Sequence, residues 1–229
     1  MFLIGCEENS SYFPLNEGTV QNYKILFVDK EDKSFTSKQT YTYLKKKNYL
    51  QPIIGNAGQI VFYFEDKSGI IRREIKYFKT ETINNFEGKK INKKKFSFSH
   101  NPIKSKKNHY VLKYPLEIGS TWSVNDITRV KMKIGFDKIF ETKLPFILDH
   151  EIVSKNETIR VSGKKYKNCL KVVGKGETSY NAGPPLGNIN IKVKTISWFA
   201  KGTGLVKTIR TESSDSQIIG KIVTTKFLE

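Results

Sequence analysis

Hydrophobic and polar residues alternate with a period of two along most of the chain, which is the pattern of half-buried β-strands. In the segment INIKVK, for example, Ile189, Ile191 and Val193 fall on one face and polar residues on the other. No window of about a dozen residues shows the periodicity of an amphipathic helix. The strand-like segments are 22–28, 35–44, 59–66, 70–80, 121–136, 144–153, 157–163, 166–173, 189–199, 204–212 and 216–227.

Short turn-like sequences such as EDKS, SGKK and AKGTG separate these segments. Strands joined by such turns at a spacing of about eight to twelve residues are typical of an antiparallel meander. We therefore predict an all-β fold, a strongly curved antiparallel sheet arranged as a half-barrel or barrel meander with little helix. A single β domain is expected over residues 12–228, with a long basic loop near 84–108 and a Gly/Pro-rich loop near 174–188.

The composition is that of a folded domain, and its charge is strongly positive. Hydrophobic residues make up 38% of the 229 residues, and 15 Phe and 11 Tyr favour strands. The formal net charge of +18 would attract nucleic acid, anionic lipid or lipopolysaccharide. Nearly all of the basic residues are Lys, however, whereas specific phosphate recognition favours the bidentate Arg fork. A Lys-rich composition with a solubilising role is the alternative.

The chain begins with MFLIGC, and Leu3–Cys6 fits a bacterial lipobox, in which Cys6 is the lipid-attachment residue. Residues 7–11 would form a polar tether, and Glu7 after the cysteine favours the outer membrane. The charged and apolar stretches of a signal peptide are missing, as a late-assigned start codon or a trimmed chain would produce. A plain N-terminal strand and a Cys6–Cys169 disulfide are the alternatives. In the lipobox interpretation, Cys169 is a lone thiol in a strand, buried and inert.

No catalytic constellation is visible in the sequence. The three histidines are His100, His109 and His150, and only His150 lies near carboxylates in the sequence. Alternation places His150 on the face opposite Asp149 and Glu151, so we expect a solvated histidine on a sheet face. The segment GKGETS lacks the spacing of a phosphate-binding loop. The two distant cysteines do not form a metal site. We predict a non-enzymatic protein with no cofactor and no bound metal.

The basic residues are concentrated in predicted turns and loops. If several loops gather at one end of the sheet, they would form a ring that faces anionic lipid or lipopolysaccharide. A simple contribution to loop solubility is the alternative. The residues assigned to this predicted loop rim are Lys93, Lys94, Lys95, Lys104, Lys106 and Lys107, and a further basic run is Lys164–Lys167.

Three patches resemble a family of small bacterial envelope lipoproteins. YFPLNEGTVQNYKI is similar to the YFPLxxGxxWxY opening that follows the lipobox cysteine there, although Gln21 stands where that family usually has Trp. VSGKKYKNCLKV resembles its GxxYxNC hairpin, and SWFAKGTGLVKT its GxGLVK closing motif. The resemblance implies no assigned enzymatic activity. It also implies a fold of the lipoprotein-carrier (LolA/LolB-like) class, a curved sheet with an apolar concave face.

The leading hypothesis is a lipid-anchored protein on the periplasmic side of the outer membrane. Its curved sheet would bind acyl chains, anionic lipid or an envelope partner. The alternative is an assembly or scaffold module without a ligand cavity, using the two long loops as contact surfaces. Nucleic-acid binding would require a cytosolic location and is the weaker third class.

Overall fold

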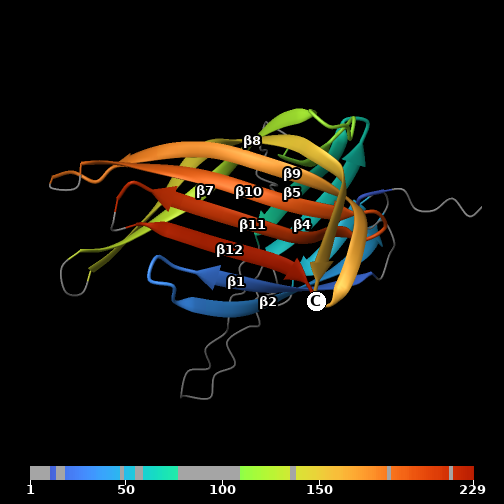
Figure 1. Cartoon of the computed structure of the whole chain (residues 1–229), viewed down its shortest axis with the longest axis horizontal. Helices are drawn as coiled ribbons and strands as arrows, with labels where there is room; N and C mark the ends of the chain where they lie inside the picture. The colour runs from blue at the N-terminus through green and yellow to red at the C-terminus, as the bar shows by residue number, and fades with distance from the viewer. Residues whose placement is uncertain are drawn as a thin grey trace, which may run out of the picture.

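The structure is a computed structural model that describes residues 11–13, 19–46, 49–54, 59–76, 109–134, 138–184, 187–216 and 219–229. Over these ranges the protein is all-β, as the alternation predicts (Figure 1). No helix in these ranges is long and apolar enough to cross a membrane. The described strands are β1 (Val20–Val28), β2 (Ser34–Lys46), β3 (Tyr49–Ile54), β4 (Gln59–Asp66), β5 (Gly69–Lys76), β6 (His109–Lys113), β7 (Thr121–Ile134), β8 (Lys138–Val161), β9 (Lys164–Asn181), β10 (Asn188–Ala200), β11 (Gly204–Ser214) and β12 (Lys221–Leu228).

The strands form one antiparallel sheet with the order β6-β5-β4-β3-β2-β1-β12-β11-β10-β9-β8-β7. The first and last strands pair in the middle of this sheet, where Tyr23 on β1 lies opposite Leu228 on β12. Strands β6 and β7 are consecutive in the chain but form the two edges. The sheet curves until these edges approach, and the Trp122 indole on β7 donates a hydrogen bond to the Tyr110 carbonyl on β6 at 3.0 Å. The predicted curved antiparallel sheet is confirmed.

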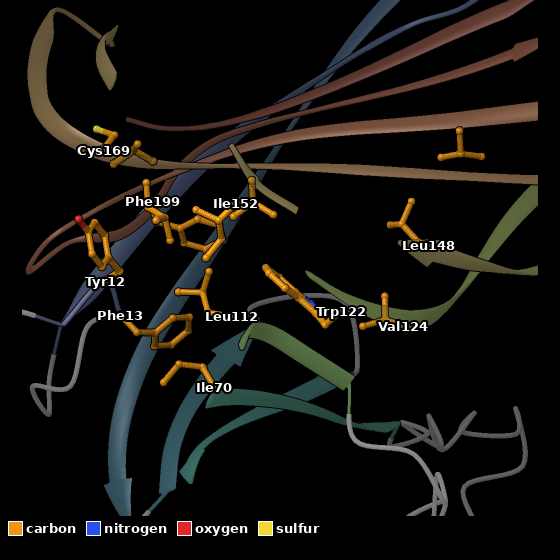
Figure 2. Packing of buried hydrophobic residues seen from close by; sticks show 14 of the residues in the cluster. Tyr12, Phe13, Ile70, Leu112, Trp122, Val124, Leu148, Ile152, Cys169 and Phe199 are labelled. Carbon is orange, nitrogen blue, oxygen red and sulfur yellow. The ribbon is translucent and has the colours of Figure 1, made fainter. Parts of the chain in front are cut away.

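Where the structure describes the side chains of a strand, alternate residues point to the inner face of the curved sheet. On β7, Trp122 and Val124 are buried whereas Ser123 and Asn125 between them are exposed. The buried apolar side chains pack together between the two arms of the sheet (Figure 2). Their burial removes apolar surface from water, which is the main stabilising contribution to such a fold. Residues with 0% exposure include Ile152, Cys169, Leu170 and Val206.

The segment Ser11–Phe13 is part of this core. Tyr12 and Phe13 are 6% and 3% exposed and pack beside Leu112 and Phe199 at one end of the sheet (Figure 2). The Gly202 N–H donates to the Ser11 carbonyl at 2.8 Å, which fixes the segment beside the β10–β11 turn. We call this end of the sheet the tether end. It comprises residues 11–13, the β8–β9 turn at 162–163 with the first residues of β9, and the β10–β11 turn at 201–203.

The strand boundaries differ from the predictions in several places. Strand β8 is continuous through the two segments predicted at 144–153 and 157–163, and β3 and β6 were not predicted. Strand β9 continues to Asn181, so the loop predicted near 174–188 is wrong over residues 174–181. Gly174 is an inward position, where a Cβ would lie 2.3 Å from Thr195 Oγ1. The glycine there provides space in a crowded strand and does not mark a turn. The predicted loop 84–108 lies outside the described residues.

Candidate binding site on the inner face

Polar side chains cross the inner face in a belt beside the apolar region at the tether end. On β12 the inward positions are Leu228, which is buried, and then Lys226. On β11 the buried Val206 is followed in the same way by Thr208 and Arg210. Thr208 pairs with Lys226 in register, and its hydroxyl lies 2.8 Å from that of Ser197 on β10. We call Lys226, Thr208, Ser197, Arg210 and the facing Asp126 the polar belt.

Lys226 is held by aromatic and amide groups of β1 and β2. Its Nζ donates to the Tyr41 hydroxyl at 2.7 Å and to Gln39 Oε1 at 3.1 Å. The same nitrogen lies 4.4 Å from the ring centroid of Tyr23 and 4.2 Å from that of Tyr41. These two rings meet edge to face at 5.3 Å and 88°. The arrangement gives the ammonium two hydrogen-bond acceptors and two π faces, which suits a cation.

No carboxylate in the described ranges forms an ion pair with Lys226. Burial, together with the like charge of Arg72 on β5, lowers the pKa of Lys226 to about 7. Both effects disfavour the charged form. The folded protein therefore holds a lysine that is partly neutral near pH 7, facing a second cation.

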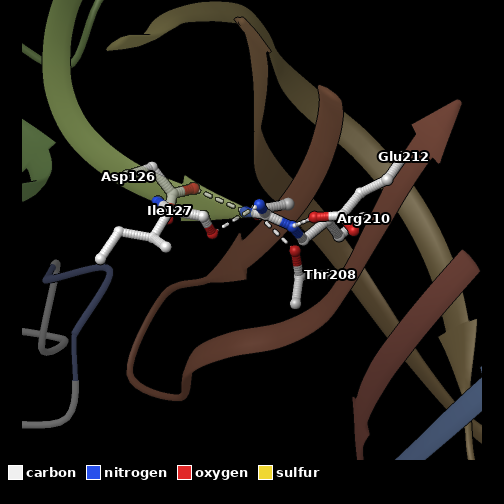
Figure 3. Close-up of polar contacts among 6 residues, drawn as sticks. Asp126, Ile127, Thr208, Arg210 and Glu212 are labelled. Atoms are coloured by element: carbon white, nitrogen blue, oxygen red, sulfur yellow. Dashed lines mark hydrogen bonds and ion pairs between the residues drawn. The ribbon is translucent and has the colours of Figure 1, made fainter. Parts of the chain in front are cut away.

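Arg210 is the opposite case, because two carboxylates surround it (Figure 3). Its Nε donates to Glu212 at 2.7 Å, its Nη1 pairs with Asp126, and its Nη2 donates to the Ile127 carbonyl at 3.2 Å. Burial alone would lower the pKa of Arg210, but the two carboxylates outweigh it and the net shift is upward. We call Arg210, Asp126, Glu212 and Ile127 the clasp.

The clasp joins strands that are distant in the sheet. Arg210 lies on β11 and Asp126 on β7, with β10, β9 and β8 between them in the strand order. The guanidinium also lies 5.7 Å from the ring centroid of Phe146 on β8. Arg210 therefore crosses the concavity and fixes the curvature of this arm. It donates to the Ile127 carbonyl opposite Pro145, which has no N–H of its own to offer.

His150 is at an inward position, so the prediction of a solvated histidine is wrong. Its ring stacks on Trp122 at 5.2 Å and 10°. Burial lowers the pKa of His150 to about 4, and the nearby His109 contributes to the shift. The side chain does point away from Asp149 and Glu151, which are exposed. Neutral and stacked against an aromatic ring, His150 serves as a packing residue at physiological pH.

Two open hollows lie at the surface of the described residues, and the walls of both combine polar and apolar groups. One of about 460 Å³ includes Trp122, His150 and Lys175, and one of about 720 Å³ includes Asn190, Ser213 and Asp215. Within the described ranges, no three His, Cys, Asp or Glu side chains are grouped as metal ligands would be. Both hollows are open to solvent, whereas a site for an acyl chain would enclose most of its surface.

Most of the predicted site residues belong to segments outside the described part of the chain. Cys6 and the predicted loop rim, namely Lys93, Lys94, Lys95, Lys104, Lys106 and Lys107, lie outside the described residues, as does His100. Cys169 is a free and fully buried thiol, as predicted for a lone thiol. Burial raises the pKa of Cys169, and Glu157 raises it further, so the reactive thiolate is disfavoured.

Sequence reasoning missed Lys226, although a signal was present. In KIVTTKFL the lysine is in phase with Ile222 and Leu228, so alternation alone places it on the inner face. A lysine at an inward strand position is uncommon enough to examine. Its partners Gln39 and Tyr41 come from strand pairings that the sequence does not reveal.

No family model matches the chain, and no curated protein matches its sequence. Among solved structures, it is similar to a "putative exported protein with YmcC-like fold" from Bacteroides fragilis, with a TM-score of 0.37 and 14% identity over 95% of this chain and 96% of that one. It is also similar to a "putative lipoprotein" from Parabacteroides distasonis, with a TM-score of 0.36 and 14% identity over 96% of this chain and 99% of that one. Similarity at this level does not establish a shared function.

Proposed function

We propose that this chain is a non-enzymatic, lipid-anchored bacterial envelope protein whose curved sheet binds an anionic group at Lys226. The single observation that carries the binding proposal is a cation on the inner face without an anionic partner in the described ranges. A buried charge is costly unless it is paired, so such groups are either neutral or matched by an ion. A ligand carboxylate or phosphate would provide the missing charge and restore the ammonium form.

The apolar part of the leading hypothesis has less support. Among the described residues, the inner face at the tether end is occupied by side chains with almost no exposure, such as Ile70, Leu112 and Ile152. A packed region of this kind does not leave an acyl chain the room of a carrier cavity. The polar belt therefore favours recognition of an anionic head group over enclosure of its chain.

The anchor is proposed from the sequence and from the position of Tyr12. The lipobox Leu3–Cys6 ends six residues before Tyr12, and Tyr12 and Phe13 are buried in the core. A chain fixed so soon after an acylated cysteine would hold the domain close to a membrane. With Glu7 after the cysteine, we place the protein on the periplasmic side of the outer membrane.

A non-enzymatic role is supported by how the candidate groups are arranged. His150 and the carboxylates of Asp149 and Glu151 lie on opposite faces of β8. Acid–base or nucleophilic catalysis requires such groups to converge on one reacting atom. Arg210 and its two carboxylates are already paired with one another.

The binding proposal is tested by calorimetric titration with lysophosphatidic acid at pH 6, with monoacylglycerol of the same chain length as the neutral control. We expect the unmodified chain to bind the phosphate-bearing lipid and Lys226→Met to lose at least about tenfold in affinity. Thr225→Val, on the opposite face of β12, serves as the matched control. Equal affinity of the wild type and Lys226→Met, or equal binding of both lipids, would overturn the proposal.

The anchor is tested by intact-mass analysis after expression from the native upstream DNA in a bacterial host. We expect a mature species that begins at Cys6 and is heavier by a diacylglyceryl group and an acyl chain. Cys6→Ser should abolish the added mass and release the protein from the membrane fraction. An unmodified chain that retains Met1 would contradict the anchor and leave the binding proposal to be judged separately.

A second candidate function is assembly with another protein through strand β7. This strand forms one edge of the sheet, and the outer-facing Ile127 on it is 53% exposed. Ile147 on β8 is 47% exposed on the same face. Edge strands with exposed apolar residues are sites of strand addition. Association through β7 is tested by measuring the molecular mass of the wild type and of Ile127→Lys by light scattering over a range of concentrations. The substitution should reduce any concentration-dependent association.

A further inference from the structure

At the tether end, two basic turns flank the N-terminal segment. The Tyr12 hydroxyl donates to the Asn168 carbonyl at 3.4 Å, just after the β8–β9 turn. On the other side, Gly202 of the β10–β11 turn donates to Ser11. Figure 1 shows the β8–β9 turn beside the C-terminus at this same end, and Ser162 Oγ donates to the Leu228 carbonyl at 2.7 Å. Residues 11–13 are thus fixed between two neighbouring turns.

The β8–β9 turn has a rigid shape that presents its side chains outward. Ser162 and Gly163 have φ angles of 49° and 79°. Two successive positive φ values are typical of a type I′ turn, which matches the twist of the flanking strands. The lysines that follow directly, Lys164 and Lys165, are both exposed. The turn therefore holds two cations at the extremity of the sheet.

Four lysines on or directly after the two turns are exposed, and none of them forms an ion pair in the described ranges. Lys201 lies with its Nζ 5.8 Å from the ring centroid of Tyr12, which associates this charge with the N-terminal segment. Some cations elsewhere on the described surface do have carboxylate partners, such as Lys171 with Glu157 at 3.1 Å. The four residues, which we call the basic rim, are Lys164, Lys165, Lys167 and Lys201.

We propose that the basic rim docks the tether end of the sheet onto an anionic lipid surface. The inference rests on the proposed anchor, because Cys6 precedes Tyr12 by six residues. Six residues span at most roughly 20 Å, even when fully extended. An acylated Cys6 would therefore hold the tether end, rather than the opposite end of the strands, next to the lipid head groups. Positive charge at that end is complementary to phosphate groups.

The rim gives the anchor a second component. The diacylglyceryl group and acyl chain proposed for Cys6 would attach the protein stably by themselves, so the basic rim adds electrostatic attraction and a fixed orientation. Each lysine close to an anionic surface strengthens binding about fivefold, so four together should contribute between about tenfold and several hundred-fold. The orientation follows as well, because the rim and the buried Tyr12 fix which end of the strands faces the lipid.

The test uses the full-length, non-acylated chain and sedimentation with two kinds of vesicle. One is pure phosphatidylcholine, and the other contains equal parts of phosphatidylcholine and phosphatidylglycerol. The rim variant carries Lys164→Gln, Lys165→Gln, Lys167→Gln and Lys201→Gln. The control variant removes the same number of exposed lysines elsewhere on the sheet, through Lys175→Gln, Lys192→Gln, Lys194→Gln and Lys221→Gln.

We expect the wild type and the control variant to bind the anionic vesicles with affinities within about threefold of each other. The rim variant should bind at least tenfold more weakly, and no protein should bind pure phosphatidylcholine. Raising the salt concentration should weaken wild-type binding, because exposed charges are screened. Thermal unfolding of both variants should match the wild type, since all eight side chains are exposed.

Equal losses in the two variants would show attraction by net charge alone and overturn the proposal. Absence of wild-type binding to anionic vesicles would overturn it as well. Because the chain in this assay has no acyl group, the result does not depend on Cys6. A failure of the rim is therefore distinguishable from a failure of the anchor, which only the intact-mass measurement detects.

Discussion

The inner face of the sheet has an apolar half at the tether end and a polar belt beside it, although both are made by the same strands. On β12, Leu228 belongs to the apolar half and Lys226, two residues before it, to the polar belt. On β11, Val206 belongs to the apolar half and Arg210 to the polar belt. The apolar half is stabilised by burial, which is not directional. The belt depends on specific pairs, so removing one partner leaves another group unsatisfied. The two halves should therefore respond differently to substitution.

The largest effect is expected in the apolar half. Phe199, which is 3% exposed, packs with the other buried side chains between the arms of the sheet. Phe199→Ala should lower the free energy of unfolding by about 3–5 kcal/mol, because it removes buried surface and leaves a cavity. Urea denaturation measures this directly. Phe35→Ala, at a side chain that is 61% exposed, is the matched control and should cost far less.

Breaking the clasp should be the next largest effect. Arg210→Leu would leave Asp126 and Glu212 close together without their cation, and we expect a loss of about 2–3 kcal/mol. Asp126→Ala should cost less, since Arg210 keeps Glu212. Denaturant titration of both variants measures the two losses in the free energy of unfolding and shows which is larger. A smaller loss for Arg210→Leu than for Asp126→Ala would show that the clasp does not work through charge pairing.

Substitution of Lys226 should stabilise the protein, whereas the substitutions of Phe199 and Arg210 should destabilise it. Lys226 is therefore the sharpest test of the difference between the apolar half and the polar belt. Its folded pKa of about 7 is below the ordinary value of 10.5, so the unfolded chain binds more protons between these limits. The free energy of unfolding should therefore rise with pH from about 7 to 10. Lys226→Met should remove this slope and stabilise the protein by about 1–3 kcal/mol at pH 6. Denaturation at pH 6 and pH 9 measures it.

Ligand binding should show the complementary pH dependence. An anion binds the protonated form of Lys226, so its affinity should fall as the pH rises through about 7. Titration with lysophosphatidic acid at pH 6 and pH 9 checks this. A Lys226→Arg variant, whose charge persists at both values, should lose most of the dependence. An unchanged wild-type affinity at pH 9 would exclude Lys226 as the contact.

The smallest effect is expected at His150, between the two halves. Its folded pKa of about 4 is below the ordinary value of 6.5, so stability should fall as the pH falls from about 6.5 to 4. His150→Phe keeps a ring for stacking on Trp122 and should flatten this loss, by about 1–2 kcal/mol at pH 4. An equal loss in both proteins would assign the acid sensitivity to other groups.

Local patterns in the sequence were sufficient for much of the fold. The alternation in INIKVK placed the buried face of β10 correctly, because a period of two follows from strand geometry itself. Gly174 and Gly176 contributed to the incorrect prediction of a loop over residues 174–181, which are part of β9. Glycine favours both turns and crowded strand positions, and only neighbouring side chains decide between them.

The chain by itself determined an antiparallel all-β protein, its buried Cys169 and its positive charge, since these depend on composition and on neighbours along a strand. Tertiary structure alone decided that β1 pairs with β12, that Arg210 meets Asp126, and that Lys226 faces Tyr41. These contacts join residues 84 or more positions apart. A local pattern carries no information on such pairs, because curvature of the whole sheet brings them together.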